Sequence, residues 1–170
     1  MPFPRSRLDS FIVFKHTSLQ TDDLEVQFQR WVLNGYISRN GERGVNYSEF
    51  GLGAFRKVVI IQSDTPKLYA NHQGGYRVFC PVNDKIVTVD FTNGVARWRG
   101  LHNEPQENQV HCSGCNQSHS LVEFFGKPNF AFGRSAFHFQ DIEIASFNDS
   151  LLREVEINID SCSLVFKRVG

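Results

Sequence analysis

The alternation of apolar and polar residues predicts a strand, a helix and a second strand near the start of the chain. Residues 9–16 form a short run rich in β-forming side chains, and residues 36–39 have the same character. Between these runs, four apolar residues recur at helical spacing: Leu24, Phe28, Trp31 and Val32. Gly35 stands just past the expected end of the helix, where a glycine commonly terminates one.

The C-terminal part of the chain shows the same order of elements. Residues 135–145 alternate as a strand does, and residues 162–169 form a second β-rich run. Asn148 or Asp149 can cap a helix between them, with an inward stripe of Leu151, Leu152, Val155 and Ile159. Two such units predict an α+β, ferredoxin-like βαβ…βαβ fold, in which two helices cover one face of an antiparallel sheet.

The middle of the chain is predicted to be an insertion into this fold. Residues 57–62 form an apolar run, and residues 76–80 and 85–91 alternate as strands should. Residues 63–126 also contain three of the four cysteines. The expected organisation is therefore a single domain, residues 1–170, with residues 63–126 as a degenerate zinc-ribbon-like β insertion.

Composition and charge restrict the classes of protein that fit. Hydrophobic residues make up 41% of the chain, with 16 phenylalanines against one methionine, so a rigid aromatic core is expected. Lys+Arg and Asp+Glu are equal at 18 each, which removes any general attraction to nucleic acid or anionic membranes. No signal-length apolar run and no membrane-spanning stretch are present, so the prediction is a cytoplasmic protein.

Three cysteines have a spacing that indicates a metal site. Cytoplasmic thiols stay reduced, so the Cys112-x-x-Cys115 pair indicates metal binding or catalysis more than a structural disulfide. Zinc takes four ligands in a tetrahedron, and a Cys-x-x-Cys turn supplies two of them. Cys80, followed by proline, begins a second such turn, but Asn83 stands where its second cysteine is expected.

The fourth ligand is predicted to be His119, which gives a compact Cys-x2-Cys-x3-His spacing. His111 and His72 are further candidates, although His111 directly adjoins Cys112, where ligand geometry is usually poor. Two alternatives stay open: thiols that act as small buried hydrophobes, and a redox pair. The redox reading is disfavoured because no tryptophan-preceded Cys-x-x-Cys motif joins a strand to a helix here.

The C-terminal half resembles an uncharacterised group of bacterial cytoplasmic proteins. Those proteins have a Cys-Pro-x-Cys turn, a Cys-x-x-Cys turn followed by Ser-Leu, an aromatic-Gly/Ala-Arg strand and a final helix and strand. The matching residues here are Cys80, Pro81, Cys112, Cys115, Ser120, Leu121, Phe132 and Arg134. The resemblance implies a zinc-ribbon-like insert, and it implies no particular activity.

The functional hypothesis from the sequence is a non-catalytic, protein-binding module of bacterial cytoplasm. Such a chain could occlude a partner protein, as immunity proteins do for bacterial toxins. Trp98, flanked by Arg97 and Arg99 on an expected strand, is the predicted exposed anchor for that partner.

Two other classes of protein remain open. A zinc-ribbon protein could bind nucleic acid through a basic, aromatic patch of Arg97, Trp98, Arg99, Lys127 and Arg134. An enzyme could use His138 and Asp141, if both face solvent from the strand at 135–145. No P-loop, Gly-x-Ser-x-Gly, dinucleotide or His-Glu-x-x-His motif is present to favour an enzyme.

Overall fold

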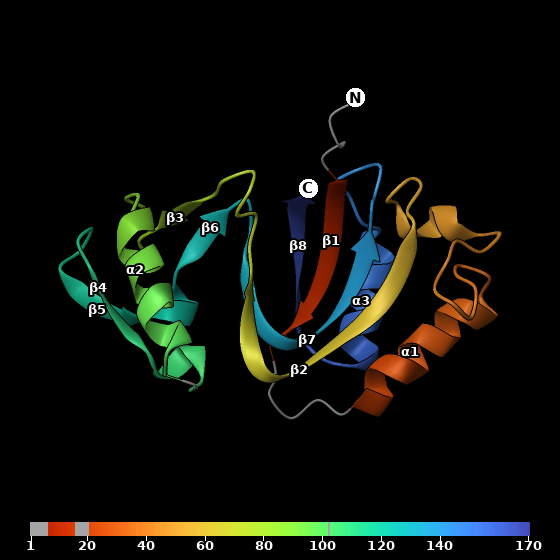
Figure 1. Cartoon of the computed structure of the whole chain (residues 1–170), viewed down its shortest axis with the longest axis horizontal. Helices are drawn as coiled ribbons and strands as arrows, with labels where there is room; N and C mark the ends of the chain where they lie inside the picture. The colour runs from red at the N-terminus through yellow and green to blue at the C-terminus, as the bar shows by residue number, and fades with distance from the viewer. Residues whose placement is uncertain (1–6, 16–20, 102) are drawn as a thin grey trace.

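The structure is a computed structural model that describes residues 7–15, 21–101 and 103–170 (Figure 1). The described strands are β1 (Arg7–Phe14), β2 (Lys57–Tyr69), β3 (Arg77–Phe79), β4 (Gln109–Cys112), β5 (Gln117–Ser120), β6 (Phe125–Lys127), β7 (Ala131–Gln140) and β8 (Cys162–Val169). The described helices are α1 (Thr21–Leu33), α2 (Thr88–Arg99) and α3 (Asp149–Asn158), with 3₁₀ turns η1 (Tyr47–Phe50), η2 (Pro105–Glu107) and η3 (Leu121–Glu123). The chain is thus mixed α/β with antiparallel sheets.

The largest sheet has four strands in the order β2-β7-β1-β8, and every neighbouring pair is antiparallel. Phe11 in β1 stands opposite both His138 in β7 and Val165 in β8, which fixes the register of the three adjacent strands. Strand β1, near the start of the chain, lies between β7 and β8, near its end. The N- and C-terminal segments therefore build this sheet together. We call this sheet with α1 and α3 the platform.

Both platform helices pack on the same face of the sheet. Trp31 of α1 lies against Phe50 and Phe137, with ring centroids 5.1 and 4.7 Å away. Val155 of α3 is fully buried in the same cluster. The other members that come from the sheet are Ile12, Phe14, Val58 and Phe139. The aromatic core expected from the composition is therefore present.

The antiparallel pairing of β2 with β7 is longer than the sequence pattern predicts. The apolar run at 57–62, which could have been a strand or a short helix, is a strand that continues to Tyr69 after an irregularity in register between Gln62 and Lys67. Polar residues and Pro66 are tolerated there because β2 is an edge strand of the sheet. Tyr69 then packs on Phe11, with ring centroids 5.2 Å apart, on the face opposite the helices. The predicted insertion at 63–126 consequently begins inside β2.

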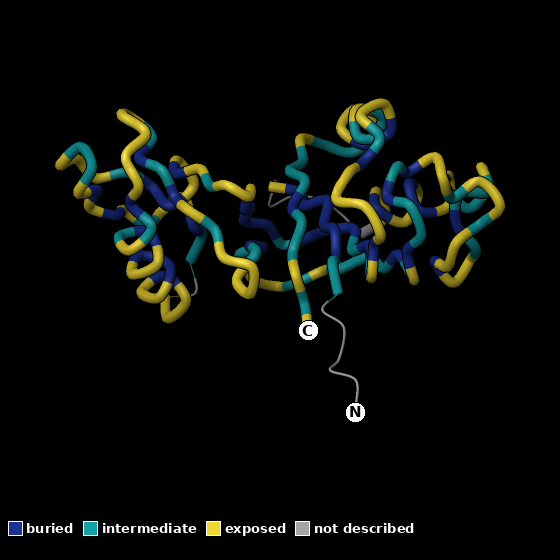
Figure 2. The backbone as a smooth tube through the Cα atoms, turned by 90° about the horizontal axis from the view of Figure 1, so that it is seen from above, coloured by how far each residue is buried: buried dark blue, intermediate teal, exposed yellow. Residues whose placement is uncertain are grey.

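Residues 70–130 form a second lobe with its own buried core, as the two buried regions in Figure 2 show. Helix α2 packs there beside two small sheets, β3–β6 and β4–β5. Phe132 of β7 packs into the core of this lobe, whose own members are Ala70, Val78, Cys80, Val87, Phe91, Val95, Trp98, Val110, Cys112, Leu121, Phe124 and Phe130. We call residues 70–130 the cysteine lobe, because it holds three of the four cysteines.

Two predicted strands are wrong. Residues 85–91 were expected to be a strand, but Thr88 begins helix α2, which buries Phe91 and Val95. Residues 36–39 contribute only an isolated bridge between Ile37 and Arg43. In both places the strand prediction relied on a few β-forming residues. Packing in the fold instead favours a helix in the first segment and a turn in the second.

Two other expectations, one for helix α1 and one for helix α3, are confirmed. Leu24, Phe28 and Trp31 form the buried stripe of α1, and Gly35 has the left-handed φ of 75° that suits a residue after a helix. The side chain of Asn148 accepts a hydrogen bond from the Ser150 N–H at 2.9 Å, so Asn148 caps α3. Within the described residues, no helix has the length and apolar character needed to cross a bilayer.

Candidate metal centre

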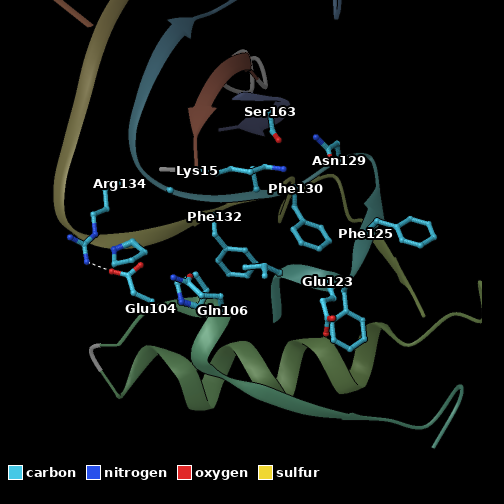
Figure 3. Close-up of a pocket in the computed structure, with 16 residues that line it drawn as sticks. Lys15, Glu104, Gln106, Glu123, Phe125, Asn129, Phe130, Phe132, Arg134 and Ser163 are labelled. Atoms are coloured by element: carbon cyan, nitrogen blue, oxygen red, sulfur yellow. Dashed lines mark hydrogen bonds and ion pairs between the residues drawn. The ribbon is translucent and has the colours of Figure 1, made fainter. Parts of the chain in front are cut away.

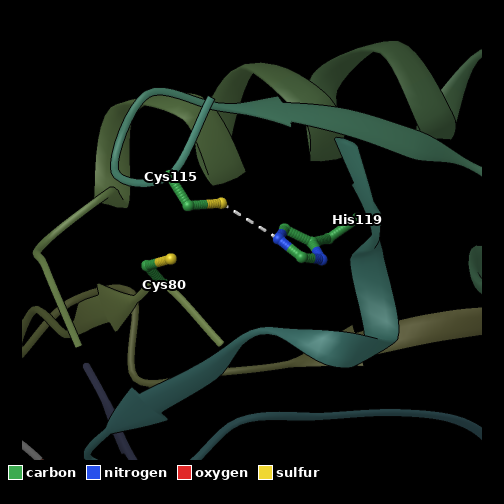
Figure 4. Close-up of side chains that lie close together, drawn as sticks. All are labelled: Cys80, Cys115 and His119. Atoms are coloured by element: carbon green, nitrogen blue, oxygen red, sulfur yellow. Dashed lines mark hydrogen bonds between the residues drawn. The ribbon is translucent and has the colours of Figure 1, made fainter. Parts of the chain in front are cut away.

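Three predicted metal ligands converge in the cysteine lobe (Figure 4). The sulfurs of Cys80 and Cys115 and a ring nitrogen of His119 all lie within 4.8 Å of one another. Ligand atoms around one tetrahedral zinc are about 3.6–3.8 Å apart, a separation that falls within this limit. The residues come from three segments: the end of β3, the β4–β5 turn and β5.

The two cysteine-bearing turns have the same backbone design. The Asp84 N–H donates to the carbonyl of Cys80 at 3.2 Å, and the Asn116 N–H donates to that of Cys112 at 2.8 Å. Asp84 and Asn116 have nearly equal left-handed φ values of 60° and 59°. Cys80 therefore corresponds in position to Cys112. We call the turn at residues 80–84 the first knuckle and the turn at residues 112–116 the second knuckle.

Asn83 occupies the place in the first knuckle that a cysteine holds in the second. Its amide nitrogen donates to the Gly114 carbonyl at 2.6 Å, and its oxygen accepts the Lys85 N–H at 3.2 Å. The missing thiolate is thus replaced by an amide that ties one knuckle to the other. A Cβ added to Gly114 would lie 3.1 Å from the Cβ of Cys80, which shows how closely the knuckles approach.

Helix α2 is hydrogen-bonded to the second knuckle. The Asp90 carboxylate accepts hydrogen bonds from the Ser113 N–H at 2.9 Å and from its hydroxyl at 2.6 Å. These bonds from Ser113 hold the pKa of Asp90 below its usual value. Helix α2, whose first residues were predicted to be a strand, therefore helps to position the candidate site.

His119 is oriented toward the cysteines by groups on its other side. Its Nε2 lies 3.1 Å from Cys115 Sγ, and its Nδ1 lies 3.6 Å from a carboxylate oxygen of Glu123. The same Glu123 oxygen accepts the Ser120 N–H at 2.6 Å, within the capping box of η3. A carboxylate behind the second ring nitrogen is the usual arrangement for a metal-binding histidine. Glu123 is a member of the site that sequence spacing did not reveal.

The thiols interact with one another and with the backbone. Burial of Cys80 opposes its ionisation, but the N–H groups of Val82 and Asn83 and the two neighbouring thiols outweigh that effect and lower the pKa of Cys80. Cys112 is fully buried, and burial, together with the Cys80 side chain, raises the pKa of Cys112. The surroundings of Cys80 thus favour the thiolate form that a metal requires, whereas those of Cys112 oppose it.

Cys112 was predicted to be a ligand, but it lies beside the close group of ligand atoms and is not a member of it. Its side chain interacts with those of Cys80 and Cys115, while the close group of ligand atoms comprises Cys80, Cys115 and His119. The two other candidate histidines have different surroundings: His111 is exposed in β4, and His72 lies beside the Tyr76 ring at 5.7 Å. The choice of His119 over these histidines agrees with the geometry.

The predicted exposed anchor Trp98 is wrong. It lies in α2, is 5% exposed, and donates from Nε1 to the Asn103 carbonyl at 2.9 Å. Its ring packs edge-on against Phe132, with centroids 5.2 Å apart. The helix places the indole inside the lobe and leaves Arg97 and Arg99 at the surface. An Arg-Trp-Arg strand with an exposed indole is thus absent from the described structure.

The wider basic patch is also divided. Arg134 forms an ion pair with Glu104, which neutralises its charge. The Lys127 ammonium lies over the Phe79 ring, 5.7 Å from its centroid, at another part of the lobe. With Trp98 buried, the aromatic member of the predicted nucleic-acid surface is no longer available.

His138 and Asp141 do not form the solvent-facing pair that an enzyme was expected to use. His138 Nε2 lies 2.7 Å from the carboxylate of the fully buried Asp9, and its ring stacks on Phe11 at 4.2 Å. The Asp141 N–H also donates to Asp9, at 2.9 Å. His138 through its ring, and Asp141 through its backbone N–H, therefore take part in a buried polar network around Asp9.

No protein-family model, curated protein or solved structure matches this chain. The assignment of function therefore depends on the geometry of the chain itself.

Proposed function

We propose that this chain is a zinc-binding protein in which the metal has a structural role. The single observation that carries the proposal is the convergence of Cys80, Cys115 and His119 from three separate segments. Cys112, whose thiol interacts with both other cysteines, would complete a Cys₃His set. Four protein ligands leave no open coordination position for a substrate, and this is typical of structural zinc.

The chemistry of the ligands favours zinc over other ions. Thiolates and imidazoles are soft or borderline ligands, which select zinc over magnesium and calcium. The equivalent knuckles are the turns expected of a zinc-ribbon-like unit. The platform supports a ferredoxin-like interpretation, because its order β2-β7-β1-β8 places β7 between the two strands that flank α1 in sequence.

Elemental analysis of protein purified without added metal tests the zinc centre. We expect about one zinc per chain, and we expect Cys115→Ser to lose it. Cys162→Ser is a matched control, since Cys162 lies in β8 of the platform, outside the knuckles. Protein that contains no zinc, or equal zinc in both variants, would contradict the proposal.

The biological role that we propose is non-catalytic binding of another protein, of the kind that immunity proteins perform. The support is a group of exposed apolar side chains beside the first knuckle: Val82 and Ile86 are 62% and 59% exposed, and Val89 at the start of α2 is 73% exposed. Exposed aliphatic residues on a metal-held turn can form the centre of a protein interface. Zinc would keep that surface in shape before the partner arrives.

Cross-linking in native cells with Val89→Glu tests this role. A partner protein captured by the wild type should be lost in Val89→Glu and kept in Ile157→Glu, a control at an equally exposed apolar position of α3 (83%). If no captured protein distinguishes the two variants, the proposed interface is wrong. Binding to DNA or RNA that falls steeply with salt would favour the nucleic-acid alternative instead.

A further inference from the structure

A cavity of about 510 Å³ lies between the platform and the cysteine lobe (Figure 3). Part of its wall consists of Lys15, which directly follows β1, and of platform residues 66, 131–134 and 163. The cysteine lobe contributes segments 104–106, 122–125 and 129–130. This volume is within the range of small-molecule sites in proteins. The cavity is separate from the cysteine cluster, although Glu123 contacts both.

The floor of the cavity is aromatic. Phe124, Phe130 and Phe132 are each almost fully buried in the core of the lobe, yet each contributes to the cavity wall. Phe130 and Phe132 meet edge to face, with centroids 6.0 Å apart. Val122 and Phe125 are 46% and 40% exposed beside them. A flat apolar body is the ligand shape that such rings accommodate.

Of the residues that the structure describes, two carboxylates and two cations line the cavity, and only one ion pair forms between them. Glu104 pairs with Arg134, and one oxygen of Glu123 accepts the Ser120 N–H beside His119. Among the described residues, Lys15 takes part in no ion pair. An anionic group on a ligand would supply the missing partner.

Two further polar side chains stand near the Lys15 ammonium group. Figure 3 shows the Lys15 side chain extending toward the part of the cavity where Asn129 and Ser163 lie. One N–H of the Asn129 amide donates to the Leu164 carbonyl at 3.0 Å, which ties Asn129 to the residue after Ser163. The second amide N–H and the Ser163 hydroxyl can therefore donate to an anion held by Lys15.

We propose that this cavity binds a small aromatic carboxylate. The carboxylate lies against Lys15, Asn129 and Ser163, and the ring system lies over Phe130 and Phe132. This inference does not rest on the zinc centre, so a protein without zinc and a protein without carboxylate binding are separate failures.

Calorimetric titration of the full chain with 2-naphthoate tests the site, and 2-naphthamide is the neutral probe of nearly equal shape. We expect saturable binding of one naphthoate per chain, with the amide about tenfold weaker. Lys15→Gln should remove this preference, while Lys57→Gln, a lysine of β2 outside the cavity wall, should keep it. Val122→Trp should block both probes by filling the cavity.

Three results would overturn the proposal: absence of saturable naphthoate binding to the wild type, equal affinity for the acid and the amide, or a preference that survives Lys15→Gln. Lys15 is exposed, so the Gln variant is expected to fold even if Val122→Trp does not. Circular dichroism of each variant confirms that point.

Discussion

Replacing Asp9 with asparagine should destabilise the platform strongly. The Asp9 carboxylate is fully buried and accepts three groups of hydrogen bonds: from Arg7 at 2.9 Å, from His138 at 2.7 Å and from the Asp141 N–H at 2.9 Å. Asparagine can keep the bond from Asp141 but loses the charge-assisted bonds to Arg7 and His138. Such bonds contribute about 1.5–3 kcal/mol each. Arg7 is 32% exposed and partly solvated, so its share is smaller, and the expected loss is about 3 kcal/mol.

The pH dependence of this loss has a defined sign. Burial alone would raise the pKa of Asp9, but the bonds from His138, Asp141 and Arg7 outweigh it and hold the pKa below the usual 3.8. A carboxyl group whose folded pKa is depressed stabilises the fold above its unfolded pKa and loses that contribution as the pH falls. The difference between wild type and Asp9→Asn should therefore be full at pH 7 and shrink below about pH 4.

Urea denaturation at pH 7 and pH 3 measures both effects. Asp64→Asn is the matched control, because Asp64 is exposed in the outer part of β2. If Asp9→Asn lies within about 0.5 kcal/mol of Asp64→Asn at pH 7, the network does not carry the stability that its geometry indicates. If Asp9→Asn lowers the free energy of unfolding by the same amount at pH 3 as at pH 7, the argument from the depressed pKa of Asp9 is wrong.

Three further results are expected. His119→Ala should weaken zinc binding, and adding Asn83→Cys should restore it, since the two knuckles are equivalent; a zinc titration in which the double variant stays weak would contradict that equivalence. Burial raises the pKa of Cys162 to about 12, so mass spectrometry should find this thiol unlabelled by iodoacetamide at pH 8, and rapid labelling would argue against its burial. Gly133→Ala places a Cβ 2.4 Å from the Phe14 carbonyl oxygen and should lower stability by about 1–3 kcal/mol in thermal unfolding; an unchanged melting temperature would show that β1 and β7 can separate.

The platform was largely predictable because its elements have strong local signals. The stripe Leu24, Phe28 and Trp31 repeats at helical spacing, and Asn148 stands before a second helical stripe. The final strand agrees with its predicted bounds, Cys162–Val169. In these segments local propensity and the burial required by the fold favour the same structure.

Helix α2 was missed because two patterns overlap in one segment. Residues 85–91 alternate as a strand does, yet Ile86 and Val89 are exposed. The residues that matter are Phe91, Gly94, Val95 and Trp98, which are spaced for a helix and are all buried. Gly94 is needed there since a Cβ would lie 2.5 Å from a methyl carbon of Val110. A glycine normally weakens a helix signal, and only the packing partner explains its place.

Three of the four predicted ligands converge, without Cys112, and the residues that support them were not predicted. Cysteine spacing identified Cys80 and Cys115, and compact spacing identified His119. The amide bridge from Asn83 and the carboxylate behind His119 depend on how two distant turns meet. The aromatic cavity likewise joins segments from both lobes, so no local pattern in the sequence could show it.

The arrangement of the cysteine lobe explains why a metal would be useful there. Its described strands are only three or four residues long, and its core packs around helix α2. A small core with short strands stabilises a fold weakly, and a structural ion supplies the cross-links that such a core lacks. The cross-link would also order the turn η3. Glu123 contacts the His119 ring and takes part in the capping box of η3, and Val122 lies in that turn. Zinc bound by the knuckles would thus fix one wall of the aromatic cavity, without taking part in any chemistry of its own.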